Sequence, residues 1–249
     1  MKTIVRKRLV GNIPVLEVVA EKLRGNKLPL IIYYHGWQIN KTLMLTQARK
    51  LAAEGLRVVL PDAPNHGERA REISPIPSLT FWNSIHGNLF EFDYIVAYFQ
   101  SRDLADERLA VGGISMGGMT TTALLTQHPE IQAAACVMGT PSLIHYRDRI
   151  MGHAQTLNFH LPKDYRALTQ WLELYDLSLN PERLANRPLF IWHGDEDERV
   201  PIEPVQAFVA DNPAANIEAH FTKAGHLVDI ATMDLVTDFF CRFFQGKLI

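Results

Sequence analysis

Residues 113–117 read Gly-Ile-Ser-Met-Gly and follow an apolar run at residues 109–111, with Gly112 between them. The pattern Gly-x-Ser-x-Gly is typical of a nucleophile elbow, a sharp strand-to-helix turn that exposes a serine oxygen. Gly113 and Gly117 are expected because strand and helix come so close at this turn that a Cβ would not fit. Residues 118–125 are uncharged and compact, as a helix buried against a sheet should be. The segment therefore predicts a strand, a turn with Ser115 at its tip, and a buried helix.

The rest of the chain alternates short apolar runs with helical patterns. The apolar runs end in Gly, Pro, Asp or His, which is typical of parallel strands buried on both faces. They lie at residues 29–34, 56–60, 109–114, 133–138, 188–192 and 217–221. Residues 3–10 and 15–20, joined through a Gly-Asn pair, predict an antiparallel hairpin at the sheet edge. Apolar residues at helical spacing are clearest from Phe81 to Phe99 and from Val228 to Phe243. We therefore predict an α/β fold with a mostly parallel sheet of about eight strands and helices on both faces.

The predicted elbow needs partners, because a serine hydroxyl is a weak nucleophile until a base accepts its proton. A histidine oriented by a carboxylate can do this, and in this kind of fold the chain order is serine, acid, histidine. His226 follows the run 217–221, and two carboxylates, Asp195 and Asp197, follow the run 188–192. The two carboxylates are only two residues apart, and their spacing leaves the choice between them open. The order of residues thus predicts a triad of Ser115, His226 and one of the two carboxylates.

Acyl transfer also needs N–H donors for the negative oxygen of the tetrahedral intermediate. The backbone N–H of Met116, next to the nucleophile at the start of its helix, is the first expected donor. The second is expected from Trp37, because Gly36 before it allows the turn after residues 30–34 to aim its N–H groups at the site. We expect His35 to hold this turn by hydrogen bonds rather than to transfer a proton.

Asn65 and His66 lie in a Pro-Asp-Ala-Pro-Asn-His-Gly loop, residues 61–67, at a strand end on the same face of the sheet. They are predicted substrate contacts. A rigid proline-rich turn explains the same residues without any contact to substrate.

Several short motifs together resemble a known family: His35-Gly36-Trp37, Gly-x-Ser-x-Gly around Ser115, His193-Gly194-x-x-Asp197 and Gly225-His226. The chain is similar to α/β-hydrolases of the dienelactone-hydrolase-like group. The likeness covers nearly the whole sequence and is weakest at residues 142–187. It implies that Asp197, four residues after His193, is the acid of the triad. Dienelactone hydrolases proper would have a cysteine at the elbow, so Ser115 favours ordinary ester hydrolysis.

These features predict a serine carboxylesterase that hydrolyses small esters, with short acyl chains, through an acyl-enzyme. The expected partners are an ester and water, and no cofactor or metal is implied. The same machinery could cleave a thioester or an amide bond, and a non-catalytic hydrolase-fold binding protein is a further alternative. A nucleotide-binding turn is excluded, because the glycines from Gly112 onward fit neither G-x-G-x-x-G nor a P-loop.

One interval, residues 141–187, is too long for a simple crossover between two strands. We predict that it forms a small helical cap over the active site, within a single domain of residues 1–249. Its aromatic residues either line a pocket or pack the cap onto the body; they are Tyr146, Phe159, Tyr165, Trp171 and Tyr175. Its three histidines lack the spacing of metal ligands; they are His145, His153 and His160.

Charge and composition limit the classes of binding partner and the cellular compartment that we expect. The formal net charge is −2, with both signs mixed along the chain, which favours neither nucleic acid nor an anionic membrane surface. No apolar run approaches the roughly 20 residues that cross a bilayer, and the basic N-terminal segment lacks the apolar stretch of a signal peptide. Cys136 and Cys241 lie in apolar segments and are expected to be reduced thiols. We therefore expect a cytoplasmic protein. The oligomeric state and the natural substrate stay open.

Overall fold

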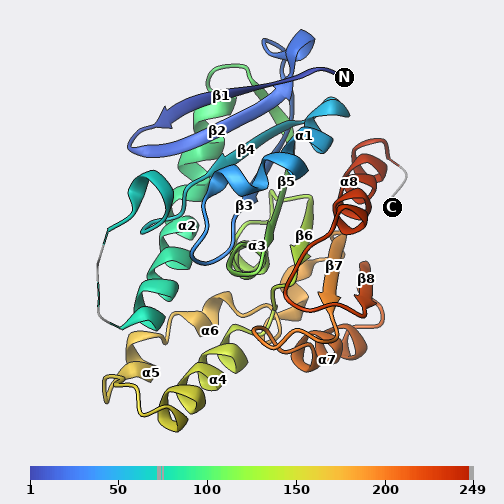
Figure 1. The fold of residues 1–249 in the computed structure, drawn as a ribbon. Coiled ribbons are helices and arrows are strands. Elements are labelled where there is room, and N and C mark those ends of the chain that lie inside the picture. The colour runs from blue at the N-terminus through green and yellow to red at the C-terminus, as the bar shows by residue number, and fades with distance from the viewer. Residues whose placement is uncertain (72–73, 75, 247–249) are drawn as a thin grey trace.

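One eight-stranded sheet forms the centre of the structure, with the strand order β1-β2-β4-β3-β5-β6-β7-β8 (Figure 1). The structure is a computed structural model and describes residues 1–71, 74 and 76–246. The strands are β1 Thr3–Val10, β2 Ile13–Ala20, β3 Leu28–Tyr34, β4 Arg57–Pro61, β5 Ala105–Ile114, β6 Ala133–Val137, β7 Leu189–Gly194 and β8 Ile217–Thr222.

Helices connect most of the strands. The α-helices are α1 Leu45–Ala53, α2 Pro77–Gln100, α3 Met116–Gln127, α4 Leu143–Thr156, α5 Tyr165–Leu168, α6 Leu172–Tyr175, α7 Glu203–Asp211 and α8 Ile230–Phe244. Short 3-10 helices are formed by Glu21–Leu23, Lys41–Met44, Gly67–Arg69 and Pro181–Leu184. No helix among the described residues is both long enough and apolar enough to cross a bilayer.

The sheet is antiparallel at one edge and parallel elsewhere. β1 pairs antiparallel with β2 and β2 with β4, whereas each neighbouring pair from β4 to β8 is parallel. The predicted edge hairpin and all the predicted buried strands are present, which confirms the predicted fold class. β5 begins at Ala105, four residues earlier than predicted. The prediction missed this first part of the strand because Glu107 and Arg108 within it are charged and exposed. An apolar pattern cannot reveal a strand where it extends past the core.

The sheet separates two hydrophobic cores, and the strands from β2 to β7 contribute to both. In β3, Leu30 and Ile32 pack into the core with α2, α3 and α7, whereas Ile31 and Tyr33 pack into the core with α1 and α8. Side chains of a strand alternate between its faces, so helices on both faces require apolar residues at every position. This is the physical origin of the continuous apolar runs in the sequence.

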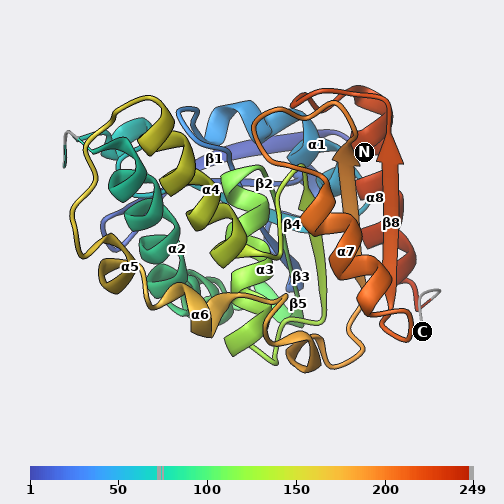
Figure 2. The same ribbon diagram turned by 90° about the horizontal axis from the view of Figure 1, so that it is seen from below.

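The long interval between β6 and β7 contains α4, α5 and α6, which lie together at one end of the sheet next to α2 (Figure 2). The Trp82 indole N–H on α2 donates to the Tyr165 hydroxyl at 2.9 Å. The His86 ring on α2 stacks on Trp171 with a 4.3 Å centroid separation. Two of the aromatic residues of this interval therefore pack it onto the body of the protein.

Candidate active site

Ser115 lies between the end of β5 and the start of α3. Its backbone has φ 53° and ψ −117°, in a region that non-glycine residues rarely adopt, as a nucleophile elbow requires. A Cβ on Gly113 would lie 2.5 Å from the Gly117 backbone, and a Cβ on Gly117 would collide with the carbonyl group of Tyr34. Both glycines are therefore needed for α3 to pack this closely against the sheet.

Three side chains meet at the carboxyl ends of β5, β7 and β8. The Nε2 atom of His226 lies 2.9 Å from the Ser115 hydroxyl oxygen, and its Nδ1 atom lies 2.6 Å from Oδ2 of Asp197. With the proton on Nδ1 donated to the carboxylate, Nε2 is free to accept the proton of the serine hydroxyl. The arrangement can therefore carry a proton away from Ser115.

The loop between β7 and α7, residues 195–202, which we call the acid loop, shows why Asp197 and not Asp195 contacts the histidine. Asp195 is exposed to solvent, whereas Asp197 is 8% exposed. The second oxygen of Asp197 accepts the backbone N–H groups of Arg199 and Val200, at 2.9 and 3.0 Å. These two donors orient the carboxylate so that its other oxygen faces the imidazole. The sequence left open which of the two carboxylates pairs with His226, and the hydrogen bonds of this turn select Asp197.

The charge state of Asp197 follows from its surroundings. Burial by itself would raise the pKa of the carboxyl, but hydrogen bonds from His193, His226 and the Val200 N–H outweigh burial and hold the pKa well below its usual value. The carboxylate is therefore ionised at neutral pH. The Nε2 atom of His193 lies 3.4 Å from Asp197, and its N–H donates to the Val200 carbonyl at 2.8 Å. His193 thus holds the turn that presents the acid.

The two predicted oxyanion donors flank the serine. Met116 is the first residue of α3, where backbone N–H groups have no partner within the helix. A Cβ on Gly36 would lie 3.4 Å from the Cβ of Ser115, so the turn that carries Trp37 passes directly beside the nucleophile. Within the described ranges, no protein atom accepts a hydrogen bond from the N–H of Trp37 or Met116. Both N–H groups are free for a ligand oxygen.

Two histidines brace the loops that follow β3 and β4. His35 accepts the Ala63 N–H at Nε2 (3.0 Å), and His66 accepts the Gln38 N–H at Nε2 (3.1 Å), so that each loop is tied to the other. Each Nδ1 atom pairs with a backbone carbonyl, that of Gly36 for His35 and that of Pro64 for His66. Burial lowers the pKa of both imidazoles, that of His35 to about 4. Both rings are therefore neutral, as acceptance at Nε2 requires.

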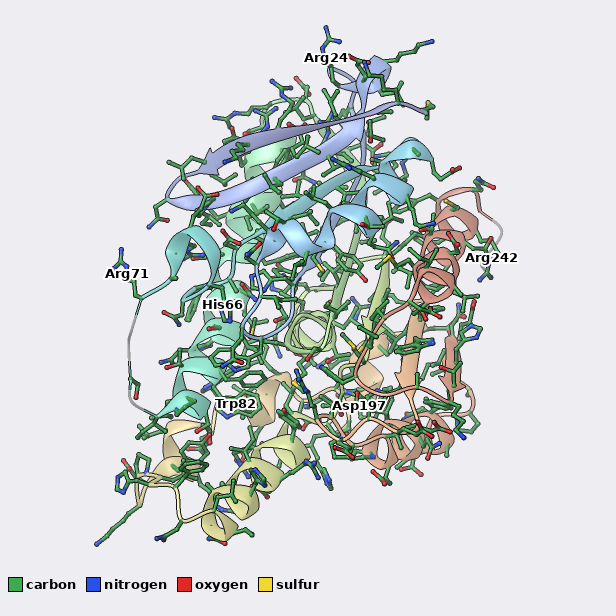
Figure 3. All side chains as sticks on the ribbon, in the orientation of Figure 1. Arg24, His66, Arg71, Trp82, Asp197 and Arg242 are labelled. Atoms are coloured by element: carbon green, nitrogen blue, oxygen red, sulfur yellow. The ribbon has the colours of Figure 1, made fainter. Side chains whose placement is uncertain are left out.

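Asn65 and His66 do not reach the cavity that contains Ser115. Both ring nitrogens of His66 are used by the backbone, and the Asn65 amide donates to the Ser84 hydroxyl at 3.3 Å. The structure thus gives the predicted substrate contacts of these residues no support, and favours the alternative of a rigid turn. Figure 3 labels His66 beside α2 and Asp197 in the loop that follows β7.

The cavity around Ser115 has a volume of about 580 Å³ and mostly apolar walls. Trp37, Phe81 and Tyr146 form one part of the wall. Leu227 and Val228, which directly follow His226, form another. Sequence reasoning did not identify these last two, although their position after the histidine was a usable signal. Leu43 and Met233 also line the cavity, and no sequence pattern pointed to either.

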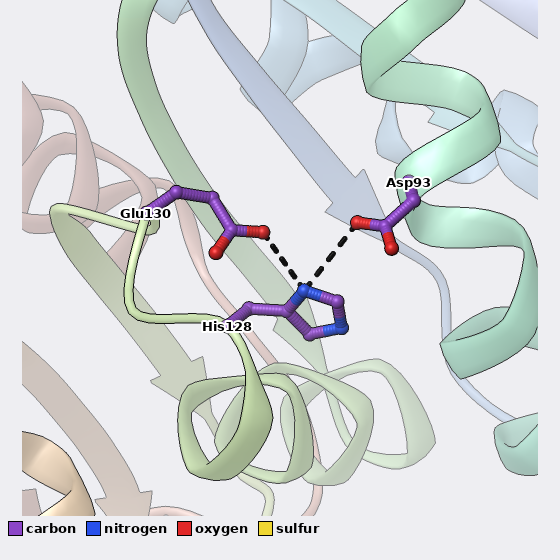
Figure 4. A group of neighbouring side chains, drawn as sticks. All are labelled: Asp93, His128 and Glu130. Atoms are coloured by element: carbon purple, nitrogen blue, oxygen red, sulfur yellow. Dashed lines mark hydrogen bonds and ion pairs between the residues drawn. The ribbon is translucent and has the colours of Figure 1, made fainter.

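A group with metal-binding atoms lies elsewhere. Asp93, His128 and Glu130 bring one ligand atom each within 4.8 Å of one another (Figure 4). The His128 Nδ1 atom lies 2.8 Å from Glu130 and 3.4 Å from Asp93, and both carboxylates are largely exposed. His128 follows the far end of α3, so the whole helix, about 18 Å long, separates this group from Ser115. The group is therefore not part of the candidate active site.

Comparisons with known proteins show which family the chain resembles. Residues 91–246 match the model of the prolyl oligopeptidase family. The chain is 36% identical over 210 residues to YitV of Bacillus subtilis, which is named as an esterase, and the match covers 82% of each chain. It is 30% identical over 200 residues to the esterase YjfP of Escherichia coli, covering 80% of each chain.

Solved structures share the fold. TT1662 from Thermus thermophilus superposes with a TM-score of 0.76 at 18% identity, covering 100% of this chain and 99% of that one. Est1E from Butyrivibrio proteoclasticus, solved with bound ferulic acid, superposes with a TM-score of 0.70 at 17% identity, covering 97% and 98%. The chain therefore has the α/β-hydrolase fold and belongs to the prolyl oligopeptidase family.

Proposed function

We propose that this protein is a serine carboxylesterase that hydrolyses small carboxylic esters through an acyl-enzyme. The observation that carries the proposal is the hydrogen-bonded chain from Ser115 through His226 to Asp197, with contacts of 2.9 and 2.6 Å. The names of YitV and YjfP support an ester as the substrate.

In the first half of the reaction, the Ser115 oxygen attacks the ester carbonyl while Nε2 of His226 takes the hydroxyl proton. The N–H groups of Trp37 and Met116 stabilise the oxyanion that forms. The intermediate then collapses, and the imidazolium gives its proton to the departing alcohol. Asp197 holds the imidazole in one tautomer and stabilises its positive charge.

In the second half, water takes the place of the alcohol. His226 accepts a proton from the water as its oxygen attacks the acyl carbonyl, and the same two N–H groups stabilise the second oxyanion. Collapse of this intermediate releases the carboxylic acid and returns the proton to Ser115. Every step uses groups of the protein, the ester and water, so the reaction as proposed requires no cofactor.

The segment with α4, α5 and α6 is proposed to act as a cap on a single catalytic domain. Tyr146 and Ile150 of α4 line the cavity that contains Ser115, which supports this role. Cys136 and Cys241 are free thiols, which supports the expected cytoplasmic compartment.

The deciding experiment replaces the nucleophile. We expect Ser115→Ala to lower kcat for p-nitrophenyl butyrate by at least about 10⁴-fold, because no other group can form the acyl-enzyme. Circular dichroism and thermal unfolding should match the wild type. Ser101→Ala, at an exposed serine beyond α2, is the matched control and should keep full activity. A fluorophosphonate probe should label the wild type and the control but not Ser115→Ala. Retained turnover in Ser115→Ala would refute the proposal.

Thioesters and amides are separated from esters by direct comparison. Matched butyryl esters, thioesters and anilides should be hydrolysed by the wild type with the highest kcat/KM for the ester. A higher kcat/KM for the thioester or the anilide would assign the same triad to a different bond.

A further inference from the structure

A second cavity of about 660 Å³ lies next to the one that contains Ser115. Its walls come from the start of α2, from α4 and from the segment after α4, with Ile76, Ala154, Phe159 and Leu161 among the lining residues. None of its lining residues is an Asp, Glu, Lys or Arg. We call this space the chain cleft. Ser78, His153 and His160 are its polar lining residues, and the rest of its wall is apolar and suits an alkyl group.

The chain cleft adjoins the cavity of the nucleophile. Pro77, Ser78 and Ile150 line both spaces. On α4, Tyr146 lines the first cavity, Ile150 lines both, and Ala154 lines the chain cleft. These residues are four apart and share one face of the helix, so that this face forms a wall about 12 Å long. A ligand that extends from Ser115 along α4 would follow this wall, and Ser78 is the one polar residue among the three that line both spaces.

The larger cavity beside α7 does not extend the site in this way. Its volume is about 940 Å³, but it shares no lining residue with the cavity of Ser115. Asp148, Glu203 and Asp211 give it an acidic wall. Of these two cavities, the chain cleft is the one that adjoins the cavity of the nucleophile.

The position of His226 decides which half of an ester enters the chain cleft. The departing alcohol must lie against Nε2 of His226 to receive its proton. Leu227 and Val228 follow His226 and line the first cavity, but neither lines the chain cleft. The alcohol therefore lies on the side of Leu227, and the acyl group points past Tyr146 towards Ile150.

We propose that the chain cleft binds the acyl chain of medium-length esters, from hexanoyl to decanoyl, and sets the acyl-length preference of the enzyme. This inference rests on the proposed function, because it assumes that Ser115 attacks an ester. It differs from the short acyl chain that the sequence suggested, since the apolar surface next to the site extends well beyond an acetyl group.

The test measures kcat/KM for p-nitrophenyl esters from acetate to decanoate, below the concentrations at which they form micelles. Each methylene that leaves water for an apolar wall is expected to raise kcat/KM up to about fourfold. We therefore expect the wild type to prefer octanoate over acetate by at least about tenfold. Ala154→Phe fills the chain cleft and should lower the octanoate-to-acetate ratio by at least about tenfold.

The matched control is Gln155→Phe, which adds the same side chain to the next position of α4, where the residue is exposed and lines neither cavity. Its ratio should equal that of the wild type. Phe159→Ala is a second variant whose folding is not at risk, because Phe159 is 67% exposed. It removes one wall of the chain cleft and should lower the octanoate-to-acetate ratio by at least about threefold.

The outcomes separate this inference from the proposed function. Hydrolysis that depends on Ser115 but shows no rise from acetate to octanoate would overturn the chain cleft and leave the esterase proposal intact. A ratio that Ala154→Phe and Phe159→Ala both leave unchanged would do the same. Absence of hydrolysis at every chain length would overturn the proposed function, and the inference with it.

Discussion

At the scale of the residue, the acid loop shows how two neighbouring carboxylates acquire different environments. Asp195 stays in solvent, whereas Asp197 is buried and accepts two backbone N–H groups before it reaches His226. Those N–H donors hold Asp197 ionised and aimed in one direction. Preorganisation of this kind removes the cost of reorienting the carboxylate when the imidazole becomes charged.

We expect Asp197→Asn to lower kcat by about 10⁴-fold at neutral pH, because an amide no longer holds the Nδ1–H tautomer of His226. KM should change little, since Asp197 does not line the cavity. The matched control is Asp195→Asn, which alters the exposed carboxylate two residues away. Steady-state kinetics on p-nitrophenyl butyrate provide the measurement. Equal losses in the two variants would contradict the assignment of the acid.

At the scale of the element, the loops after β3 and β4 depend on each other. His35 and His66 each accept a backbone N–H from the opposite loop, and each can do so only while its ring is neutral. Trp37, the proposed oxyanion donor, lies within the braced segment. The shape of this part of the site is therefore linked to the protonation of buried histidines.

This linkage predicts a pH dependence of stability. Burial lowers the pKa of His35 to about 4 in the folded protein, whereas the pKa of an unfolded histidine is about 6.5. Between these values the unfolded chain binds a proton that the folded protein does not, so the free energy of unfolding falls as the pH falls. His35 should account for about 3 kcal/mol of that fall, all of it between pH 6.5 and 4.

Urea unfolding at a series of pH values provides the test. His35→Gln should be less stable than the wild type at pH 7.5, and the difference should shrink as the pH approaches 4. His145→Gln, at an exposed histidine, is the control and should keep the wild-type pH dependence. An unchanged pH dependence in His35→Gln would show that His35 is not the linked group.

At the scale of the whole molecule, a buried ion pair joins the antiparallel edge to the parallel part of the sheet. Glu17 of β2 and Arg57 of β4 are both fully buried and paired, and Arg8 of β1 lies 2.5 Å from the same glutamate. Arg57 also donates to the backbone carbonyls of Leu104 and Asn26. One side chain thus satisfies polar groups from segments that are distant in the sequence.

We expect Arg57→Met to lower the free energy of unfolding by about 3–5 kcal/mol, because it leaves Glu17 buried beside an incomplete set of partners. The double variant Glu17→Leu/Arg57→Met should be more stable than Arg57→Met alone, since the buried carboxylate is gone. Lys50→Met, which removes a more exposed ion pair with Asp234, should cost less than about 1 kcal/mol. Urea unfolding measures all three. A double variant less stable than the single one would contradict this account.

Sequence alone determined the features that depend on local chemistry. The elbow at Ser115, the buried strands and the order of serine, acid and histidine follow from turn geometry, side-chain alternation and chain order, which neighbouring residues specify. Tertiary packing decided the rest. It placed Asp197 rather than Asp195 against His226, turned His66 towards the backbone, and set α4 beside Ser115 as the wall of a second cavity. Such contacts join residues far apart in the chain, and no periodic pattern records which of them will meet.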